Sequence, residues 1–201
     1  MDIASLKESV GKISKLMTEN KDYLIKLDQQ NGDGDLGVSM SEGFAAAYQA
    51  LNDTAETDLG KTLMAAGRAF NEAAPSSLGT ILSFGFMGMA KALKGKTEAQ
   101  LPEIADAMMA GVENIMAKAG SKPGEKTILD AIYPAAKCLQ ENKDGDKAEA
   151  FRKAAAAAAE GSESTKAMKS VHGRAAYYGE KSIGLLDGGS VVGKLIFEAL
   201  A

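Results

Sequence analysis

Residues 28–42 read Asp28-Gln29-Gln30-Asn31-Gly32-Asp33-Gly34-Asp35-Leu36-Gly37-Val38-Ser39-Met40-Ser41-Glu42. The three glycines exclude a helix interior here, because glycine loses more backbone freedom on folding than any other residue. The apolar residues before Asp28 recur at helical spacing, and Ser39 to Glu42 has the S-x-x-E pattern of a capping box. The stretch therefore predicts a helix that ends at Asp28, a loop, and a new helix from Ser39.

Helical patterns extend over the rest of the chain. The 201 residues include 35 alanines but only 24 Val, Ile and Thr residues combined. Alanine is the best helix former, whereas β-branched residues favour strands. We expect an all-α bundle of about eight or nine helices in one domain, residues 1–201, with helices over residues 3–28, 39–51, 58–73, 77–93, 97–119, 127–140, 146–160, 165–171 and 191–200.

Composition and charge exclude several classes of protein. The chain is 45% hydrophobic with a net charge of −4, which is typical of a globular protein and argues against a nucleic-acid partner. No apolar run approaches the roughly 20 residues of a membrane span, and the first residues lack a signal-peptide pattern. The single cysteine, Cys138, fits a reducing compartment. We expect a cytoplasmic protein with no membrane partner.

Three carboxylates, those of Asp28, Asp33 and Asp35, lie within eight residues of sequence. Asp28 is placed at a helix C-terminus, where the macrodipole disfavours an anion, and the flexible loop lets the other two fold back toward it. Like charges 4 Å apart repel by about 1 kcal/mol even in water, so a cation should offset them. Carboxylates without a nearby His or Cys suit Mg²⁺ or Ca²⁺. A solvated Asp/Gly turn is the simpler alternative.

An EF-hand calcium loop is a second alternative. In a loop that starts at Asn31, Asp33 and Asp35 fill the third and fifth positions and Glu42 the twelfth. Leu36 stands at the sixth position, where the motif requires glycine. A similar run, Asn142-Lys143-Asp144-Gly145-Asp146, has lysine at both the sixth and the twelfth position and is expected to be a solvated turn.

A helix start directly after the carboxylates indicates a phosphate site. Free N–H groups at a helix N-terminus bind phosphate, and Gly37 allows close approach. Three aspartates and a nucleoside diphosphate together carry a charge of about −6, which two Mg²⁺ ions reduce to about −2. The sequence contains no Walker A loop, Rossmann fingerprint or kinase loop, so a nucleotide site here belongs to a different fold.

Four motifs resemble the nucleotide-binding L subunit of dihydroxyacetone kinases. They occur in family order over residues 28–189 and read Asp28-(x4)-Asp33-x-Asp35-x-Gly37-x-x-Met40, Gly124-Glu125-Lys126-Thr127-Ile128-Leu129-Asp130, Thr165-Lys166-Ala167-Met168, and Gly173-Arg174-Ala175-Ala176-Tyr177-Tyr178-Gly179-Glu180-Lys181-Ser182-Ile183-Gly184. The length of the chain also matches a free-standing L subunit. The resemblance implies a barrel of eight antiparallel helices.

The resemblance also implies the residues of the site. In the family three aspartates hold two Mg²⁺ ions that bridge to the phosphates of ADP or ATP, which implies Asp28, Asp33 and Asp35 as metal ligands. No catalytic residue is implied, since phosphoryl transfer depends on positioning and charge neutralisation. The implied nucleotide-binding residues are Leu36, Gly37, Val38 and Ser39 at the helix start, Ser76 and Ser77 in a serine turn, and Gly120, Ile128, Arg174, Asp187, Gly188 and Gly189 toward the base.

Several positions depart from the family pattern. Leu36 and Leu185 stand where the family usually has histidine, and Ala73 and Ala74 replace glycines before the serine turn. The loss of a histidine beside the phosphates alters the phosphate geometry that the resemblance implies. Such differences are typical of a divergent paralogue that acts on another sugar or polyol.

The resemblance implies a phosphotransferase subunit that is active only with partners. A separate K-type subunit holds the ketose or triose in the family, and an M-type phosphocarrier of the phosphotransferase system recharges bound ADP; exchange with ATP is the other donor route. The alternative is a non-catalytic nucleotide- or metal-binding adaptor of the same fold, and fatty-acid kinases contain a more distantly similar domain. Lys126 and Arg174 are the charges expected near phosphate, with a solvated role equally open, and His172 is expected to be structural.

Overall fold

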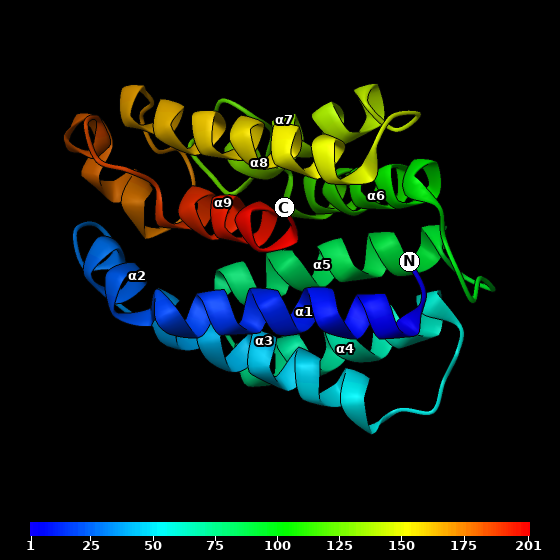
Figure 1. Cartoon of the computed structure of the whole chain (residues 1–201). Helices are drawn as coiled ribbons and strands as arrows, with labels where there is room; N and C mark the ends of the chain where they lie inside the picture. The colour runs from blue at the N-terminus through cyan, green and yellow to red at the C-terminus, as the bar shows by residue number, and fades with distance from the viewer.

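The computed structural model describes all 201 residues and contains helices but no strands (Figure 1), which confirms the all-α prediction. Two short 3₁₀ helices, η1 (Thr165–Ala167) and η2 (Arg174–Ser182), lie between the last two α-helices. The α-helices are α1 (Ile3–Glu19), α2 (Lys21–Asp28), α3 (Leu36–Asp53), α4 (Leu59–Ala73), α5 (Ser77–Ala92), α6 (Leu101–Ala119), α7 (Leu129–Glu141), α8 (Lys147–Ser164) and α9 (Gly188–Leu200).

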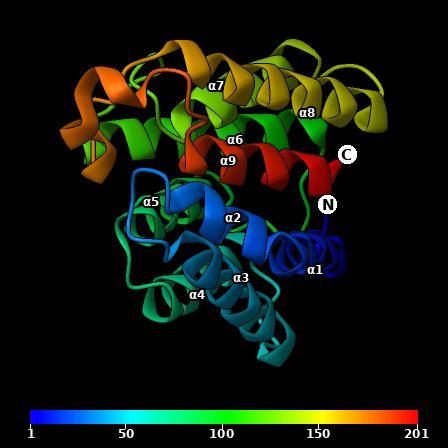
Figure 2. The ribbon, with the colours of Figure 1, turned by 90° about the vertical axis from the view of Figure 1, so that its left-hand side faces the viewer.

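Eight of these helices close into a barrel. Helix α1 packs on α3, each helix from α3 to α8 packs on the next, and α9 packs on both α8 and α1, so that the ring is complete. Helix α2 continues from the end of α1 and packs on α3 (Figures 1 and 2). The barrel of antiparallel helices that the resemblance implies is therefore confirmed.

The alternating chain direction gathers like helix ends together. Helices α3, α5, α7 and α9 all begin at one end of the barrel, and the N-terminus lies toward the other (Figure 1). We call the first of these the loop end. Seen from that side, the loop between α2 and α3 lies beside the segment that leads into α9 (Figure 2). The N-terminal partial positive charges of four helices thus converge at the loop end.

The predicted start of α3 is wrong by three residues. The helix begins at Leu36, and Ser39, the expected cap, is buried in its first turn. The start of this helix packs closely against α2, since a Cβ on Gly37 would lie only 2.1 Å from the carbonyl oxygen of Lys21. The first turn of α3 therefore stands directly against α2, with Asp35 at its N-cap position.

Other boundaries differ for local reasons. Helix α6 begins at Leu101 rather than at residue 97, with the Glu103 carboxylate accepting a 2.8 Å hydrogen bond from the N–H of Gln100. Helix α9 begins at Gly188, three residues before the predicted start, and Asp187 caps it by accepting from the N–H of Ser190 at 2.7 Å. The expected helix over residues 165–171 is only the short η1. The first predicted helix is two helices, α1 and α2.

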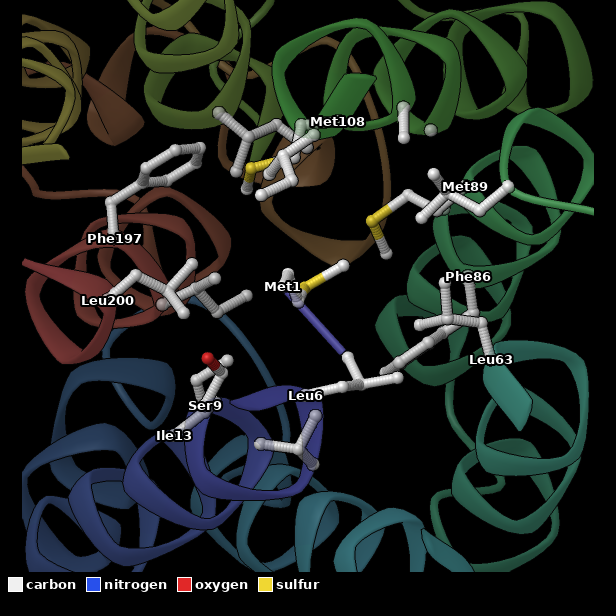
Figure 3. Close-up of a pocket in the computed structure, with 18 of the residues that line it drawn as sticks. Met1, Leu6, Ser9, Ile13, Leu63, Phe86, Met89, Met108, Phe197 and Leu200 are labelled. Atoms are coloured by element: carbon white, nitrogen blue, oxygen red, sulfur yellow. The ribbon is translucent and has the colours of Figure 1, made fainter. Parts of the chain in front are cut away.

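The core consists of 43 buried apolar residues. Phe44 and Phe70 stack edge-to-face with their ring centroids 4.9 Å apart. A cavity of about 350 Å³ remains inside the barrel toward the chain termini, lined by residues that include Met1, Met89 and Leu200 (Figure 3). None of the helices combines the length and apolar character that a membrane span requires.

Candidate functional site

The three aspartates of the first motif come together at the loop end. Asp28 is the last residue of α2, Asp33 lies in the following loop, and Asp35 directly precedes α3. One carboxylate oxygen of each lies within 4.8 Å of the others. Asp28 is half-buried, whereas Asp33 and Asp35 are exposed. An ion that enters from solvent therefore meets three carboxylates at once.

Two glycines fold the loop around Asp28. The N–H of Gly34, which has a positive φ of 79°, donates a 2.7 Å hydrogen bond to Oδ2 of Asp28. A Cβ on Gly32 would lie 2.2 Å from Oδ1 of the same carboxylate. Only glycine leaves room for this turn, so the glycines hold the loop in the shape that brings the carboxylates together.

The cluster lacks positive charge. Partial burial of the Asp35 carboxyl, followed by the neighbouring charges of Asp33 and Asp28, raises its pKa above the ordinary value. The one basic side chain paired with the three aspartates is that of Arg174, whose Nη2 lies 2.8 Å from Oδ2 of Asp33. Oxygen ligands alone, in a group that repels itself, fit a hard divalent cation such as Mg²⁺. The residues present therefore suit the metal that the resemblance implies.

The start of α3 offers hydrogen-bond donors next to this cluster. The N–H groups of Leu36, Gly37 and Val38 have no acceptor within the protein, and the side chain of Asp35 makes no capping bond. Helix α9 begins alongside, since a Cβ on Gly188 would lie 2.6 Å from Cδ2 of Leu36. Free N–H groups at converging helix N-termini form a site for an anion.

The remaining residues predicted to bind the nucleotide differ in exposure and in the contacts that they make. Ser76 is the N-cap of α5, where its Oγ accepts from the N–H of Gly79 at 3.1 Å, and Ser77 beside it is exposed. Ile128 is buried, with its backbone nitrogen 3.3 Å from where a Cβ on Gly189 would stand. Gly120 is exposed at the end of α6, and no atom lies within 4 Å of the Cβ position.

The geometry disagrees with the EF-hand alternative. Residues 36–42 are helical, so the loop that would carry the calcium ligands ends after its fifth position, Asp35. Glu42, the required twelfth ligand, is an exposed residue of α3.

Asp187 is held in an unusual electrostatic state. Burial of its carboxyl, together with the charges of Asp130 and Asp28, raises its pKa to about 7 against the opposing effect of the hydrogen bond from Ser190 N–H. The nearby Lys126 ammonium lowers it. Another acidic residue, Asp130, is buried, and its carboxylate accepts hydrogen bonds from the N–H groups of Gly124 at 2.5 Å and Thr127 at 2.7 Å. These bonds shape the loop before α7.

Lys126 is not where sequence reasoning placed it. It faces neither phosphate nor solvent: the residue is 3% exposed, and its Nζ donates to backbone carbonyl groups of residues 165–185. His172 is exposed, with its Nε2 2.6 Å from Oε2 of Glu125. Glycine spacing revealed the aspartate loop, but no local pattern distinguishes a buried lysine from a solvated one.

The fold and the site together define a class of protein: a closed helical barrel with a carboxylate cluster suited to a cation, and with free helix N–H groups, at the loop end. The family model described as the DAK2 domain matches residues 30–201. The chain belongs to this family, as the resemblance of its motifs to dihydroxyacetone kinases predicted.

Relatives match most of this chain. The PEP-dependent dihydroxyacetone kinase 1, ADP-binding subunit DhaL, of Listeria innocua is 33% identical over 90% of this chain and 87% of its own length. The corresponding subunit of Escherichia coli is 27% identical over 92% of this chain and 90% of its own. The L-erythrulose 1-kinase of Mycolicibacterium smegmatis is 31% identical, and the match spans only 33% of it.

A solved structure shows the same fold. The dihydroxyacetone kinase from C. freundii, in complex with AMP-PNP and Mg²⁺, superposes with a TM-score of 0.78 over 98% of this chain at 22% identity. The match covers 33% of that longer chain.

Proposed function

We propose that this chain is the ADP- or ATP-binding, Mg²⁺-dependent phosphotransfer subunit of a dihydroxyacetone-type kinase. The observation that carries the proposal is the convergence, at the loop end, of three carboxylates with the unpaired N–H groups of α3. Carboxylates that bind a cation, beside N–H groups that donate hydrogen bonds to an anion, suit a metal-bound phosphate chain better than a cation or an anion alone. Two relatives that match nearly the whole chain are named as ADP-binding subunits.

Asp28, Asp33 and Asp35 are the residues that would hold two Mg²⁺ ions, and bound Mg²⁺ supplies neutralisation of phosphate charge. The N–H groups of Leu36, Gly37 and Val38 face the loop end and would donate to phosphate oxygens, where negative charge develops during transfer. The exposed Oγ of Ser77 and the hydroxyl of Ser76 at the start of α5 are proposed as further donors.

The base and sugar of the nucleotide would lie toward α7 and α9. The starts of these helices approach closely at Ile128 and Gly189, and Asp187 and Gly188 continue that surface. Gly120 borders open space at the same end of the barrel. Arg174, now paired with Asp33, carries a charge that suits phosphate once the carboxylate binds a cation.

The chain would act as a carrier rather than as a complete kinase. A K-type subunit would present the hydroxyl of a ketose or triose to the loop end. An M-type phosphocarrier would rephosphorylate the bound ADP, or ATP would exchange for it. Docking brings the acceptor oxygen within about 3–3.5 Å of the phosphoryl group and excludes water, which free diffusion does not achieve. We assign this role to one domain, residues 1–201, acting in the cytoplasm.

Phosphorus NMR tests the carrier role. The chain with Mg-ATP and dihydroxyacetone should form no phosphorylated product, and addition of a K-type subunit should start its formation. A sample with the K-type subunit alone controls for that partner's own activity. Equal rates with and without the partner would instead identify a complete small kinase, and no product with either K-type or M-type partners would favour the non-catalytic adaptor.

A further inference from the structure

Lys126 holds a buried ammonium group among backbone carbonyl groups. Its Nζ lies 2.8 Å from the carbonyl oxygen of Thr165, 3.1 Å from that of Met168, 2.7 Å from that of Ser182 and 2.6 Å from that of Leu185. An ammonium has three N–H donors, so four carbonyl oxygens must share them. This surrounding shell of carbonyl oxygens is the kind that binds a desolvated cation.

The four carbonyl groups flank one segment of the chain. Two precede and two follow residues 169–181, which we call the Arg174 loop. Two further bonds close the base of this loop: the N–H of Ser170 donates to Oγ of Ser182 at 2.9 Å, and the N–H of Gly184 donates to the carbonyl of Lys166 at 2.8 Å. The ammonium of Lys126 therefore lies at the point where the loop leaves the barrel and returns.

Both arms of the loop lead to residues of the proposed nucleotide site. The loop itself carries Arg174, whose guanidinium reaches Asp33 at 2.8 Å. The returning arm leads from Leu185 to Asp187, whose N–H donates to Oγ1 of Thr165 at 3.1 Å before α9 begins. Any movement at the base would displace both groups together.

A lysine is unfavourable at this position for local reasons. Lys126 is the one residue other than glycine with a positive φ, 59°, a conformation that favours glycine. Its burial also removes the ammonium from water, and this lowers its pKa. No carboxylate lies within hydrogen-bonding distance of Nζ, so the carbonyl groups are its direct partners, and the nearby charge of Asp187 also favours the ammonium. Strain of this kind is concentrated at functional sites.

We infer that Lys126 is a positioning residue: its ammonium acts as a built-in cation that closes the base of the Arg174 loop, and it thereby places Arg174 and Asp187 for nucleotide binding without touching the nucleotide. The inference rests on the proposed function, in which those two residues contact ADP or ATP. It predicts that the contribution of Arg174 to binding depends on Lys126.

A double-mutant cycle tests this dependence. Calorimetric titration with Mg-ADP would compare the wild type with Lys126→Met, with Arg174→Ala and with the double variant. Lys126→Met should weaken binding by about tenfold or more, and the loss caused by Arg174→Ala should shrink from about tenfold to less than about twofold in the Lys126→Met background. Lys122 is an exposed lysine of the loop that contains Lys126, and Lys122→Met should change affinity by less than about twofold.

Independent effects of the two substitutions would overturn the inference, as would unchanged affinity in Lys126→Met. A wild type that binds no Mg-ADP would instead overturn the proposed function. Lys126→Gly, whose backbone suits the positive φ, provides a second variant: butylammonium should restore its ADP affinity, whereas butanol should not. Equal effects of the two additives would contradict a role for the ammonium.

Hydrogen exchange on the nucleotide-free wild type gives a readout that needs neither a variant nor ADP. The amides of Ser170 and Gly184, which are bonded at the base, should exchange far more slowly than those of residues 171–181. Exchange at the base as fast as in the rest of the loop would contradict an anchored base and overturn the inference.

Discussion

Residues 31–35 and 142–146 have nearly the same sequence, Asn-Gly-Asp-Gly-Asp and Asn-Lys-Asp-Gly-Asp, and both precede a helix. In the second turn Asp146 caps α8 by accepting from the N–H of Glu149 at 2.9 Å, and Lys153 lies 3.0 Å from Oδ1 of Asn142. In the first turn Asp35 makes no capping bond to α3. The two turns therefore share residue types but not their bonds.

The difference shows what distinguishes a candidate site from an ordinary acidic turn. The preceding helix adds Asp28 to the first turn, and the glycines fold the loop onto that carboxylate. Helix α3 is left with free N–H groups, and the clustered carboxylates have one cationic partner, Arg174. A site of this kind is marked by interactions that the protein leaves unmade, rather than by the number of its aspartates.

The largest expected contrast between the turns is in nucleotide binding. Asp33→Asn removes one negative charge from the cation site and should weaken Mg-ADP binding by about 3 kcal/mol or more, since the ion couples directly to the phosphates. Asp144→Asn, the matched change in the second turn, should leave the affinity unchanged. Calorimetric titration compares the two. Equal affinities would show that the carboxylates hold no cation.

The glycines give a second contrast. Gly32→Ala would place a Cβ 2.2 Å from Oδ1 of Asp28 and should weaken Mg-ADP binding by about 2 kcal/mol, because the carboxylate must move. Gly145→Ala places its Cβ no closer than 3.4 Å to any atom and should leave binding unchanged. Titration of both variants checks this, and a Gly32→Ala protein that binds like the wild type would separate loop shape from function.

Stability should depend on pH through the buried carboxyl of Asp187. Because the pKa of Asp187 is raised to about 7, the folded chain binds more protons than the unfolded chain between pH 4 and 7. Its contribution to stability is present at low pH and is lost as the pH rises. Urea unfolding in EDTA should show the free energy of unfolding falling by about 2 kcal/mol from pH 5 to 7.

Two variants assign that pH dependence. Asp187→Asn should flatten the profile, whereas Asp144→Asn should keep its slope. The raised pKa of Asp35 acts in the same direction as that of Asp187. A profile that rises over the same interval would have the wrong sign for this explanation.

The smallest contrast concerns the helix caps. Asp146→Ala removes the acceptor for Glu149 N–H and should cost about 1 kcal/mol, or about 2–4 °C in the thermal midpoint. Asp35→Ala removes no capping bond and relieves repulsion from Asp28 and Asp33, so the metal-free chain should lose no stability. Thermal melts in EDTA measure both, and a loss of stability in Asp35→Ala would reveal a capping role.

Local sequence patterns predicted the helices but not all of their ends. Alanine content and apolar spacing act within single turns, so they reveal where helices form. The first turn of α3 packs against the backbone of α2 at Gly37, a long-range contact that no capping pattern around Ser39 contains. The segment of the short η1 likewise makes contacts with Lys126 that lie outside any local pattern.

The candidate site was predictable where its parts are close in sequence. Asp28, Asp33 and Asp35 lie in one loop, so their spacing alone indicates a cluster. The carbonyl groups bound by Lys126 lie 39 to 59 residues away along the chain, so the residues next to the lysine do not predict them.

The dependence of nucleotide binding on Mg²⁺ tests the central claim most directly. ADP would be titrated calorimetrically into the wild-type chain, once with excess Mg²⁺ and once with EDTA. The convergence of three carboxylates and free helix N–H groups predicts clear binding in the first titration and none in the second. The same affinity in both would contradict a site in which the aspartates hold the phosphates through a metal.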